Sequence, residues 1–270
     1  MLRHEGHELK RVIVSTPGDA YFDRARHTGA NIPELPDPDR TRQQHDAVKA
    51  TLADSGCEVI DVPELAGDPN SVFTRDVALC TPRGYIRMRM GLETRRGEVA
   101  WIADALDALK EPCVGEIAPP GTVEGGDVIL AGDVAFVGLS SRTNRNGAAQ
   151  LSVMLQGMDY AVRTVQSPKG TLHLGGVMSV IGPTRILAVR GLVPKEVLEG
   201  FDVVETGMRG PSTGNVICLR DNEVIANAAE NEDAIWVLAQ AGVHVHSLDL
   251  SEFRKGAGGP TCLILPVQRG

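Results

Sequence analysis

The sequence predicts an α/β protein in which a unit of two strands, a helix and a third strand is repeated around a closed ring. Three observations lead to this prediction. Short apolar segments alternate with amphipathic helical segments along the chain. Tight turns join two strands before each helical segment, and the pattern recurs at a spacing of roughly 50 residues. A doubly wound sheet also alternates strands and helices. Its parallel strands need long crossover connections, however, and the tight hairpins before the helices join antiparallel strands instead.

The first complete unit spans 71–119. Residues 71–80 and 85–90 flank the turn sequence TPRG and are predicted to form a hairpin, because apolar segments surround a Pro/Gly turn. The helix 94–109 and the strand 113–119 complete the unit. The same order predicts three further units, with elements at 127–132, 134–139, 143–156 and 160–166; at 177–182, 185–190, 194–200 and 202–207; and at 215–220, 223–228, 230–242 and 243–250.

The two ends of the chain supply a fifth unit if they pair. The first part of the chain contains a strand, a helix and a further strand, at 11–16, 39–55 and 57–63, but no second strand to complete a hairpin. The last apolar segment, 261–267, provides this strand. This pairing closes the ring and removes exposed strand edges. Because no low-complexity linker interrupts the pattern, we expect a single domain over 1–270.

The composition is that of a globular protein and argues against several classes of partner. The chain has 270 residues, of which 42% are hydrophobic and 23% charged, so it can bury a large core. A formal net charge of -8 argues against a nucleic-acid partner and suits a small cationic substrate. No apolar run approaches the roughly 20 residues of a membrane span, so no membrane partner is expected. The sequence leaves the formation of a homo-oligomer open.

The cysteines indicate a reducing compartment, and we expect the protein in the cytoplasm. Their number is odd, their spacing is wide and irregular, and no CxxC pair is present. Cys262 stands apart because it follows a glycine-rich segment that can present its thiol at the start of a strand. The others are expected to pack as apolar residues: Cys57, Cys80, Cys113 and Cys218.

Four short segments carry chemically versatile residues, and each lies at the start of a predicted hairpin or strand. The segments are PNSVFTRD at 69–76, EGGD at 124–127, LHL at 172–174 and GPTC at 259–262. In a ring of repeated units, equivalent positions face one central cavity, so we expect one residue of each segment to meet there. These residues are Asp76, Glu124, His173 and Cys262.

This set has a coherent chemistry for a substrate that carries a guanidinium group. The thiolate of Cys262 would attack an electrophilic carbon, and His173 would protonate the leaving group and then activate water. Carboxylates near a thiol raise its pKa and weaken it as a nucleophile. A guanidinium resolves this conflict, because carboxylates hold it in bidentate fashion while its charge favours the thiolate. The mechanism needs no metal and no organic cofactor.

Three longer segments resemble a known superfamily in order and spacing. They are EGGDVILAGDVAFVGLSSRTNRNGAAQL, LHLGGVMSVIGPTRILAV and GGPTCLIL. They resemble the guanidino-group modifying superfamily, also called the amidinotransferase or pentein superfamily, and within it the dimethylargininase family. The similarity runs over nearly the whole chain. It implies a five-bladed α/β propeller, in agreement with the ring, and a hydrolase acting on C–N bonds of linear amidines.

The resemblance implies a role for each of the central residues. Cys262 matches the nucleophile, His173 the general acid and base, and Glu124 the carboxylate that orients this histidine. Asp76 matches the aspartate that grips the guanidinium. The segment 16–29 occupies the place of a lid over the site, and its glycines suit a mobile loop.

Four more residues are expected to contact the substrate. Arg95 and Arg142 match the two arginines that hold the α-carboxylate, a role that suits the fork of the guanidinium. Asn70 stands where the family commonly has aspartate. Asp127 is a candidate as well, although in its Gly-Gly-Asp turn a local hydrogen bond to the backbone is an equal alternative.

Departures from the family pattern leave the substrate open. Arg75 stands where dimethylargininases commonly have glutamate, and PNSVFTRD resembles arginine deiminases and arginine dihydrolases. Gly175 favours a methylated substrate, because deiminases carry an acidic residue at this position. We expect dimethylarginine or monomethylarginine to be hydrolysed to citrulline and a methylamine. The alternatives are hydrolysis of free arginine to citrulline or ornithine, amidino transfer to an amine, and binding of an arginine-like ligand without catalysis.

Two remaining pairs of residues receive structural interpretations. His244 and His246 share one face of a predicted strand and resemble metal ligands, but a third ligand is not evident, so a solvated edge strand is expected. Trp101 and Trp236 lie on the apolar stripes of their helices and are predicted to belong to the core.

Overall fold

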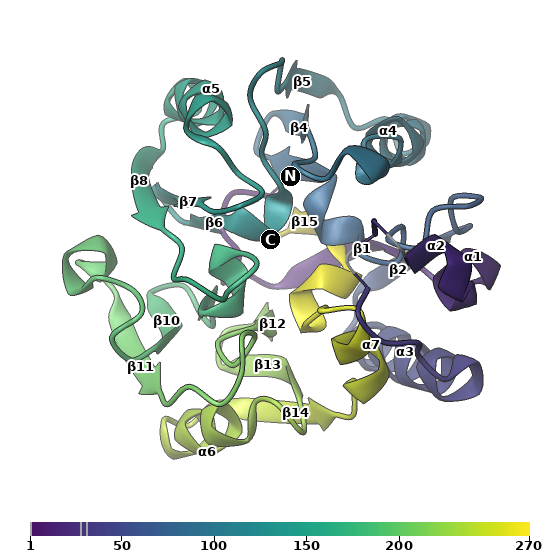
Figure 1. Ribbon diagram of the computed structural model, residues 1–270. Helices are drawn as coiled ribbons and strands as arrows, with labels where there is room; N and C mark the ends of the chain where they lie inside the picture. The colour runs from purple at the N-terminus through teal and green to yellow at the C-terminus, as the bar shows by residue number, and fades with distance from the viewer. Residues whose placement is uncertain (1, 28, 31) are drawn as a thin grey trace.

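The computed structural model describes residues 2–27, 29–30 and 32–270, which form a mixed α/β fold. Their strands make five three-stranded sheets (Figure 1). In each sheet the central strand pairs antiparallel with one neighbour and parallel with the other. The α/β class and the repeated strand order predicted from the sequence are confirmed, and a single doubly wound sheet is excluded.

Four sheets follow one another along the chain, each built from a hairpin, a helical connection and a third strand. The strands are β3 (Ala78–Thr81), β4 (Gly84–Arg87) and β5 (Cys113–Glu116); β6 (Val128–Ala131), β7 (Val134–Leu139) and β8 (Ala161–Gln166); β9 (Met178–Val180), β10 (Arg185–Val189) and β11 (Asp202–Thr206); β12 (Val216–Arg220), β13 (Glu223–Asn227) and β14 (His244–Leu248). The connections are α4 (Glu98–Ala108), α5 (Arg145–Gln156), the 3₁₀ helix η5 (Lys195–Leu198) and α6 (Glu232–Gln240).

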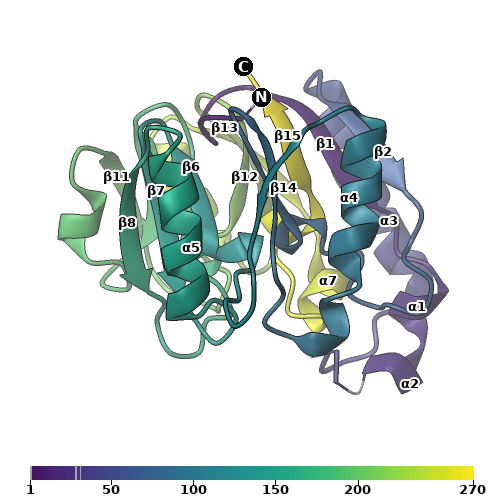
Figure 2. The same ribbon diagram turned by 90° about the horizontal axis from the view of Figure 1, so that it is seen from above.

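The remaining sheet is made from both ends of the chain, as predicted. Its strands are β1 (Leu9–Ser15), β2 (Glu58–Val62) and β15 (Leu265–Arg269), and α3 (Pro38–Asp54) connects β1 to β2. β1 pairs antiparallel with β15, in a register that places Leu9 opposite Arg269. Both termini lie at one end of the molecule, and the short helices α1 (Asp19–Phe22), α2 (Arg24–His27) and α7 (Ser251–Lys255) lie toward the other (Figure 2).

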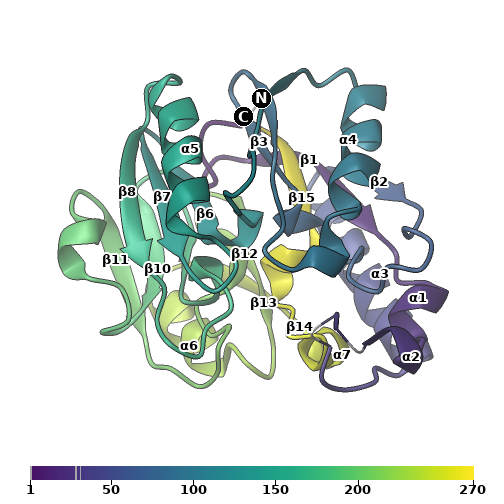
Figure 3. The same ribbon diagram turned by 45° about the horizontal axis from the view of Figure 1, so that its top comes forward.

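The helices surround the sheets. α3, α4, α5 and α6 lie at the periphery, whereas β6, β12 and β15 lie nearer to the middle (Figures 1 and 3). The largest apolar cluster joins the sheet of β3, β4 and β5 to the sheet of β6, β7 and β8, with Ile86, Leu106, Leu130 and Leu151 completely buried. Among the described residues, none of the helices combines the length and apolar character that crossing a lipid bilayer would require.

The predicted strand at 71–80 is shorter than expected. β3 begins at Ala78, because the chain before it folds into a turn in which Phe73 N–H donates to the Asn70 carbonyl, 2.8 Å away, followed by the 3₁₀ helix η1 (Thr74–Asp76). The hairpin turn after β3 needs glycine at Gly84, where φ is 134° and a Cβ atom would approach the Pro112 carbonyl oxygen to 2.1 Å. The prediction was therefore right for the hairpin and wrong for residues 71–77.

Three further predictions were wrong at the periphery. The expected helix at 194–200 is only the four-residue 3₁₀ helix η5. Trp236 is 65% exposed, because Ala234 and Leu238 form the buried face of α6 and position 236 lies between them in sequence, on the opposite face. Cys113, expected to pack as an apolar residue, is exposed on the edge strand β5.

Candidate active site

Four 3₁₀ turns converge near the middle of the fold, and each precedes a strand of a different sheet. η1 precedes β3, η3 (Gly125–Asp127) precedes β6, η4 (Leu174–Gly176) precedes β9, and η6 (Pro260–Leu263) precedes β15. η1 contacts both η6 and η3, and η3 contacts η4. The fold therefore brings together the four sequence segments that were expected to meet.

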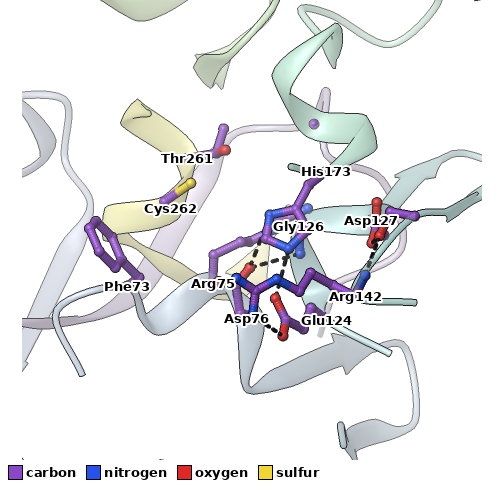
Figure 4. Close-up of polar contacts among 12 residues, drawn as sticks. Phe73, Arg75, Asp76, Glu124, Gly126, Asp127, Arg142, His173, Thr261 and Cys262 are labelled. Carbon is purple, nitrogen blue, oxygen red and sulfur yellow. Dashed lines mark hydrogen bonds and ion pairs between the residues drawn. The ribbon is translucent and has the colours of Figure 1, made fainter. Parts of the chain in front are cut away.

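A narrow cavity at this convergence is lined by seven of the eight predicted site residues. Its volume of about 20 Å³ leaves room for roughly one water molecule. Figure 4 shows the sulfur of Cys262 directed toward the side on which His173 and Asp76 lie. The seven residues are Asn70, Asp76, Arg95, Glu124, Arg142, His173 and Cys262.

A larger cavity of about 130 Å³ adjoins the first and shares His173 and Cys262 with it. Its other walls include Gly175, Gly176 and Leu172. Among the described residues that border it, His173 alone has a charged side chain. A Cβ atom on Gly175 would lie 2.9 Å from the Gly126 carbonyl oxygen, which leaves little room for a side chain there. This cavity offers space for an uncharged group next to the thiol.

His173 forms a buried ion pair with Glu124. Its Nε2 donates to the Glu124 Oε2 atom, 2.8 Å away, and its Nδ1 lies 3.9 Å from Asp76 Oδ1. Burial alone would lower the pKa of His173, but the charge of Asp76 and the hydrogen bond to Glu124 outweigh it and raise the pKa to about 9. Although burial opposes it, the same hydrogen bond to His173 lowers the pKa of Glu124. At neutral pH the imidazole is therefore protonated and able to donate a proton.

Asp76 is held from two sides. Its Oδ1 accepts from the Gly126 N–H at 3.1 Å, and its Oδ2 accepts from Arg95 Nη1 at 2.7 Å. Arg95 in turn donates to both carboxylate oxygens of Glu98, each at 2.7 Å, and to the Phe73 carbonyl at 3.2 Å. Most of the donors of Arg95 are thus engaged within the protein, and its contact with a substrate carboxylate stays a prediction.

Arg142 differs from Arg95 in having an unengaged guanidinium. The nearest carboxylate oxygen is Glu124 Oε1, 3.8 Å from Nη1, and the described part of the chain provides no hydrogen-bond acceptor for this side chain. It lines the narrow cavity and is almost buried, with 12% of the side chain exposed. An anionic group that enters the cavity would find its donors available.

Cys262 is a neutral thiol in the unliganded protein. Its sulfur accepts a hydrogen bond from the Gly259 N–H at 3.5 Å. Burial and, after it, the negative charge of Asp76 raise the pKa of Cys262 to about 12. Burial and the charge of Asp76 thus outweigh the cations already in the site, and the nucleophilic thiolate requires an additional positive charge beside the sulfur.

Asp127 does not line either cavity and has local partners. Its Oδ1 accepts from the Leu174 N–H at 2.9 Å, and its Oδ2 accepts from the Ser140 hydroxyl at 2.6 Å. Leu174 directly follows His173, so Asp127 fixes the turn that presents the imidazole. This is the local backbone contact considered as the alternative, and a substrate contact of Asp127 stays a prediction.

Arg75, the main departure from the family pattern, forms a buried ion pair. Its Nη2 donates to Glu5 Oε1 at 2.7 Å and to the Val128 carbonyl at 2.8 Å. Glu5 Oε1 also accepts from the Leu130 N–H at 3.1 Å. The side chains of Arg75 and Glu5 are only 8% and 11% exposed. Arg75 therefore links the N-terminal segment and β6 to the turn that carries Asp76.

We expect Arg75→Met to destabilise the protein by about 3 to 5 kcal/mol, because it leaves the buried Glu5 carboxylate without its cation. Urea unfolding followed by circular dichroism measures the change in free energy. The control is Arg190→Met, whose ion pair with Glu205 is exposed and whose loss should change stability by less than about 1 kcal/mol. Equal effects of the two substitutions would contradict the prediction.

The segment 16–29, expected to act as a lid, is held near its start by a carboxylate, and its role as a lid stays a prediction. The Glu64 carboxylate accepts from the N–H groups of Gly18, Ala20 and Tyr21, at 2.9, 2.9 and 3.0 Å. Just beyond the segment, Asn70 Nδ2 donates to the Ala30 carbonyl at 2.9 Å. Asn70 and Ala30 both line the narrow cavity, so Asn70 fixes the backbone of its wall.

We expect Glu64→Ala to loosen the lid, because three N–H groups at the start of α1 lose their acceptor. Trypsin should then cleave faster after Arg24 and Arg26, and KM should rise more than kcat falls. The matched control is Glu116→Ala, at an exposed position on β5. An unchanged cleavage rate in Glu64→Ala would show that the carboxylate does not secure the lid.

Asp76, Glu124 and His173 also satisfy the spacing of a metal site, since their ligand atoms lie within 4.8 Å of one another. Their surroundings oppose a divalent cation. Arg95 and Arg142 place guanidinium nitrogens 4.0 and 3.8 Å from Glu124, and the protonated imidazole adds a third positive charge. The charge balance suits an organic cation at Asp76 and an anion at Arg142.

Three carboxylates that hold other parts of the site in place were not predicted from the sequence. Glu98 fixes Arg95, Glu64 fixes the lid, and Glu5 pairs with Arg75. Glu98 had a usable signal, because it lies three residues after Arg95 at the first turn of a helix, a spacing at which ion pairs form. Glu5 and Glu64 lie 70 and 44 residues from the groups they bind and carry no local signal.

A family model and curated relatives match most of the chain. The family model for eukaryotic N,N dimethylarginine dimethylhydrolase matches residues 29–269. The N(G),N(G)-dimethylarginine dimethylaminohydrolase of Pseudomonas aeruginosa is 31% identical over 259 residues, covering 95% of this chain and 99% of the relative. The protein of the same name from Streptomyces coelicolor is 31% identical over 228 residues, covering 82% of this chain and 83% of the relative.

Solved structures lead to the same family. A cysteine-to-serine variant of the Pseudomonas aeruginosa enzyme, in complex with citrulline, superposes with a TM-score of 0.85 at 30% identity, over 96% of this chain and 99% of that one. The N-terminal domain of a cyanobacterial arginine dihydrolase shares the fold, with a TM-score of 0.82 at 18% identity over 97% and 98% of the two chains. By the family model and by relatives that it matches over nearly their full length, this chain belongs to the dimethylarginine dimethylaminohydrolase family.

Proposed function

We propose that this protein hydrolyses dimethylarginine or monomethylarginine to citrulline and a methylamine. The observation that carries the proposal is the convergence of a neutral thiol, a protonated histidine and a carboxylate on one cavity. Cys262, His173 and Asp76 line this cavity, and Glu124 holds the imidazole. Family membership supports the same reaction.

The first half of the reaction forms a covalent intermediate. The guanidinium of the substrate pairs with Asp76, and its positive charge stabilises the thiolate of Cys262, whose proton is released to solvent as the substrate binds. The thiolate attacks the guanidino carbon, and the protonated His173 gives its proton to the departing methylamine as the C–N bond breaks. The product of this half is a thiouronium on Cys262.

The second half regenerates the enzyme. The now neutral His173 takes a proton from water, and the hydroxide attacks the thiouronium carbon. The C–S bond then breaks, citrulline is released and the thiol of Cys262 is restored. Arg142 has donors available to hold the α-carboxylate of the substrate throughout, and Arg95 contributes the donor that Glu98, Asp76 and Phe73 leave unused.

The proposal includes a closed five-bladed α/β propeller formed by a single catalytic domain, 1–270, that acts in the cytoplasm. Five three-stranded sheets and the pairing of β1 with β15 support closure. Contacts of β15 with β3, of β6 with β9 and of β9 with β12 support the placement of successive sheets side by side. The substrate is a small guanidino amino acid, with no requirement for a metal or an organic cofactor.

Hydrolysis of free arginine is the second candidate, and two observations favour it. Arg75 and Asn70 are both integrated into the fold, through Glu5 and Ala30. An arginine deiminase of Listeria innocua is 24% identical over 257 residues, covering 75% of this chain and 62% of the relative. Against it, the cavity beside Gly175 offers space for methyl groups, and the described residues place no carboxylate on its walls for a bare nitrogen.

The deciding experiment compares kcat/KM for arginine, monomethylarginine and asymmetric dimethylarginine, with citrulline and ornithine identified as products. We expect citrulline from the methylated substrates, with a preference over arginine of roughly 10-fold to 200-fold, the range that one methyl group in a pocket provides. Citrulline from arginine alone would make the protein a deiminase, and ornithine with ammonia a dihydrolase. A new guanidino product when glycine is added to arginine would indicate amidino transfer, and tight binding without turnover would indicate a binding protein.

A further inference from the structure

A cluster of two histidines and a glutamate lies on the sheet of β12, β13 and β14. β14 is an edge strand and pairs in parallel with β13, in a register that places Glu223 opposite His244 and Ile225 opposite His246. Side chains two residues apart on a strand share a face, as do directly opposite residues on neighbouring strands. The ligand atoms of Glu223, His244 and His246 lie within 4.8 Å of one another. The third ligand, which the sequence did not reveal, comes from the neighbouring strand.

The geometry within the cluster is close to that of a metal site. His246 Nε2 lies 2.8 Å from Glu223 Oε1, and the two imidazole rings are 4.7 Å apart between centroids. In a tetrahedral site with metal–ligand distances of about 2.0 to 2.2 Å, the ligand atoms are roughly 3.4 Å apart. Small rotations of the side chains therefore suffice to direct three ligand atoms at one ion.

The surroundings supply both an orienting partner and access. Arg220 Nε lies 3.0 Å from Glu223 Oε2, so it holds one carboxylate oxygen and leaves the other facing His246. Such outer contacts orient ligands in metal sites. His244 is exposed, while His246 and Glu223 are half-buried, so an ion can enter from solvent without a conformational change.

We propose that Glu223, His244 and His246 bind a divalent transition metal ion such as Zn²⁺, with water completing the coordination. Two imidazoles and one carboxylate favour zinc and the neighbouring transition metal ions over calcium or magnesium, which prefer oxygen ligands alone. The ion cross-links β13 to β14 and stabilises the folded protein by an amount that grows with the logarithm of the metal concentration above Kd.

This site is separate from the candidate active site. Glu223 begins β13 at the hairpin end of the sheet, whereas Asn215, just before β12, lines the cavity beside Cys262. The length of β13, four steps of about 3.3 Å, places the two ends of the sheet roughly 13 Å apart. Loss of the metal ligands should therefore leave turnover unchanged.

The test uses the full chain, reduced and freed of metal with a chelator, in a Cys262→Ser background so that the catalytic thiol cannot contribute. Zn²⁺ is titrated by calorimetry, and Co²⁺ is titrated by its visible absorption. We expect one bound equivalent, with affinity lowered more than about tenfold by His244→Gln and by His246→Gln. The matched control, His7→Gln, removes an exposed histidine elsewhere and should leave the affinity unchanged.

Melting temperatures provide the second readout. Saturating Zn²⁺ should raise the Tm of the parent and of His7→Gln, but not that of His244→Gln or His246→Gln. The melting temperature without metal verifies that each variant is folded. If His246→Gln does not fold, His244→Gln carries the test, because His244 is exposed. Either of two results would overturn the proposal. One is an equal zinc affinity of His244→Gln and the parent. The other is the absence of zinc binding to the parent at about 100 μM, a concentration on the order of the dissociation constant of a weak site.

Discussion

The Cys262→Ser variant should lose turnover by roughly 10⁴-fold or more while its fold and melting temperature are retained. A serine hydroxyl is a far weaker acid than a thiol, and the site that raises the pKa of Cys262 to about 12, through burial and then Asp76, would disfavour an alkoxide even more. Citrulline formation measures the loss, and circular dichroism verifies the fold. Cys113→Ser, at an exposed thiol on β5, is the control and should keep full activity. Residual turnover close to that of the parent would refute nucleophilic catalysis by Cys262.

The same pKa predicts how the thiol reacts with alkylating agents. Because burial and Asp76 hold Cys262 neutral, a neutral reagent such as iodoacetamide should react slowly at pH 7 and faster as the pH rises toward 12. An alkylating agent that carries an amidinium should react much faster at pH 7, since its charge replaces that of the substrate guanidinium beside Asp76. Equal rates for the two reagents at pH 7 would show that a cation does not activate the thiol.

Glu124→Gln should lower kcat by roughly 10² to 10⁴-fold and move the alkaline limb of the pH profile to lower pH. Burial lowers the pKa of His173, and Asp76 and Glu124 together raise it to about 9, so removing one of these charges lets it fall. The protonated imidazole needed for the leaving group is then lost at a lower pH. The measurement is kcat between pH 6 and pH 10, with Glu116→Gln as the matched control. An alkaline limb that stays in place would contradict the role of Glu124.

The charge on His173 also couples the site to stability. Its folded-state pKa of about 9 lies above the ordinary value of 6.5, so protonation stabilises the folded state fully below pH 6.5. This contribution is lost as the pH rises through 9. The site therefore contributes most to stability in the pH range in which His173 is ready to act as an acid.

The parts of the structure that repeat along the chain could be predicted from the sequence. The hairpins recur with similar patterns, so the convergence of the turns at Cys262 and His173 followed from their equivalent places in successive units. The pairing of β1 with β15 followed from one strand left over at each end. Periodic information of this kind is present in every unit and does not depend on a single contact.

The parts that depend on single long-range contacts could not be predicted. Nothing near Arg75 in sequence indicates that Glu5 neutralises it, and nothing near the lid indicates that Glu64 caps α1. The segment after Pro194 has helical composition, yet only a four-residue 3₁₀ helix fits between β10 and β11. Trp236 shows that an aromatic residue on an amphipathic helix does not establish which face is buried.

The sheet built from both ends of the chain sets the order in which the protein becomes active during synthesis. Leu9 is translated long before its partner Arg269, because 259 residues lie between them in the sequence. Pairings between residues so distant in sequence form late, because loop closure is costly in entropy. Cys262 lies on the turn that leads directly into β15, so the nucleophile enters the site in this last step. Nascent chains that end before Cys262 therefore carry the histidine and its carboxylates without the thiol, and they are inert.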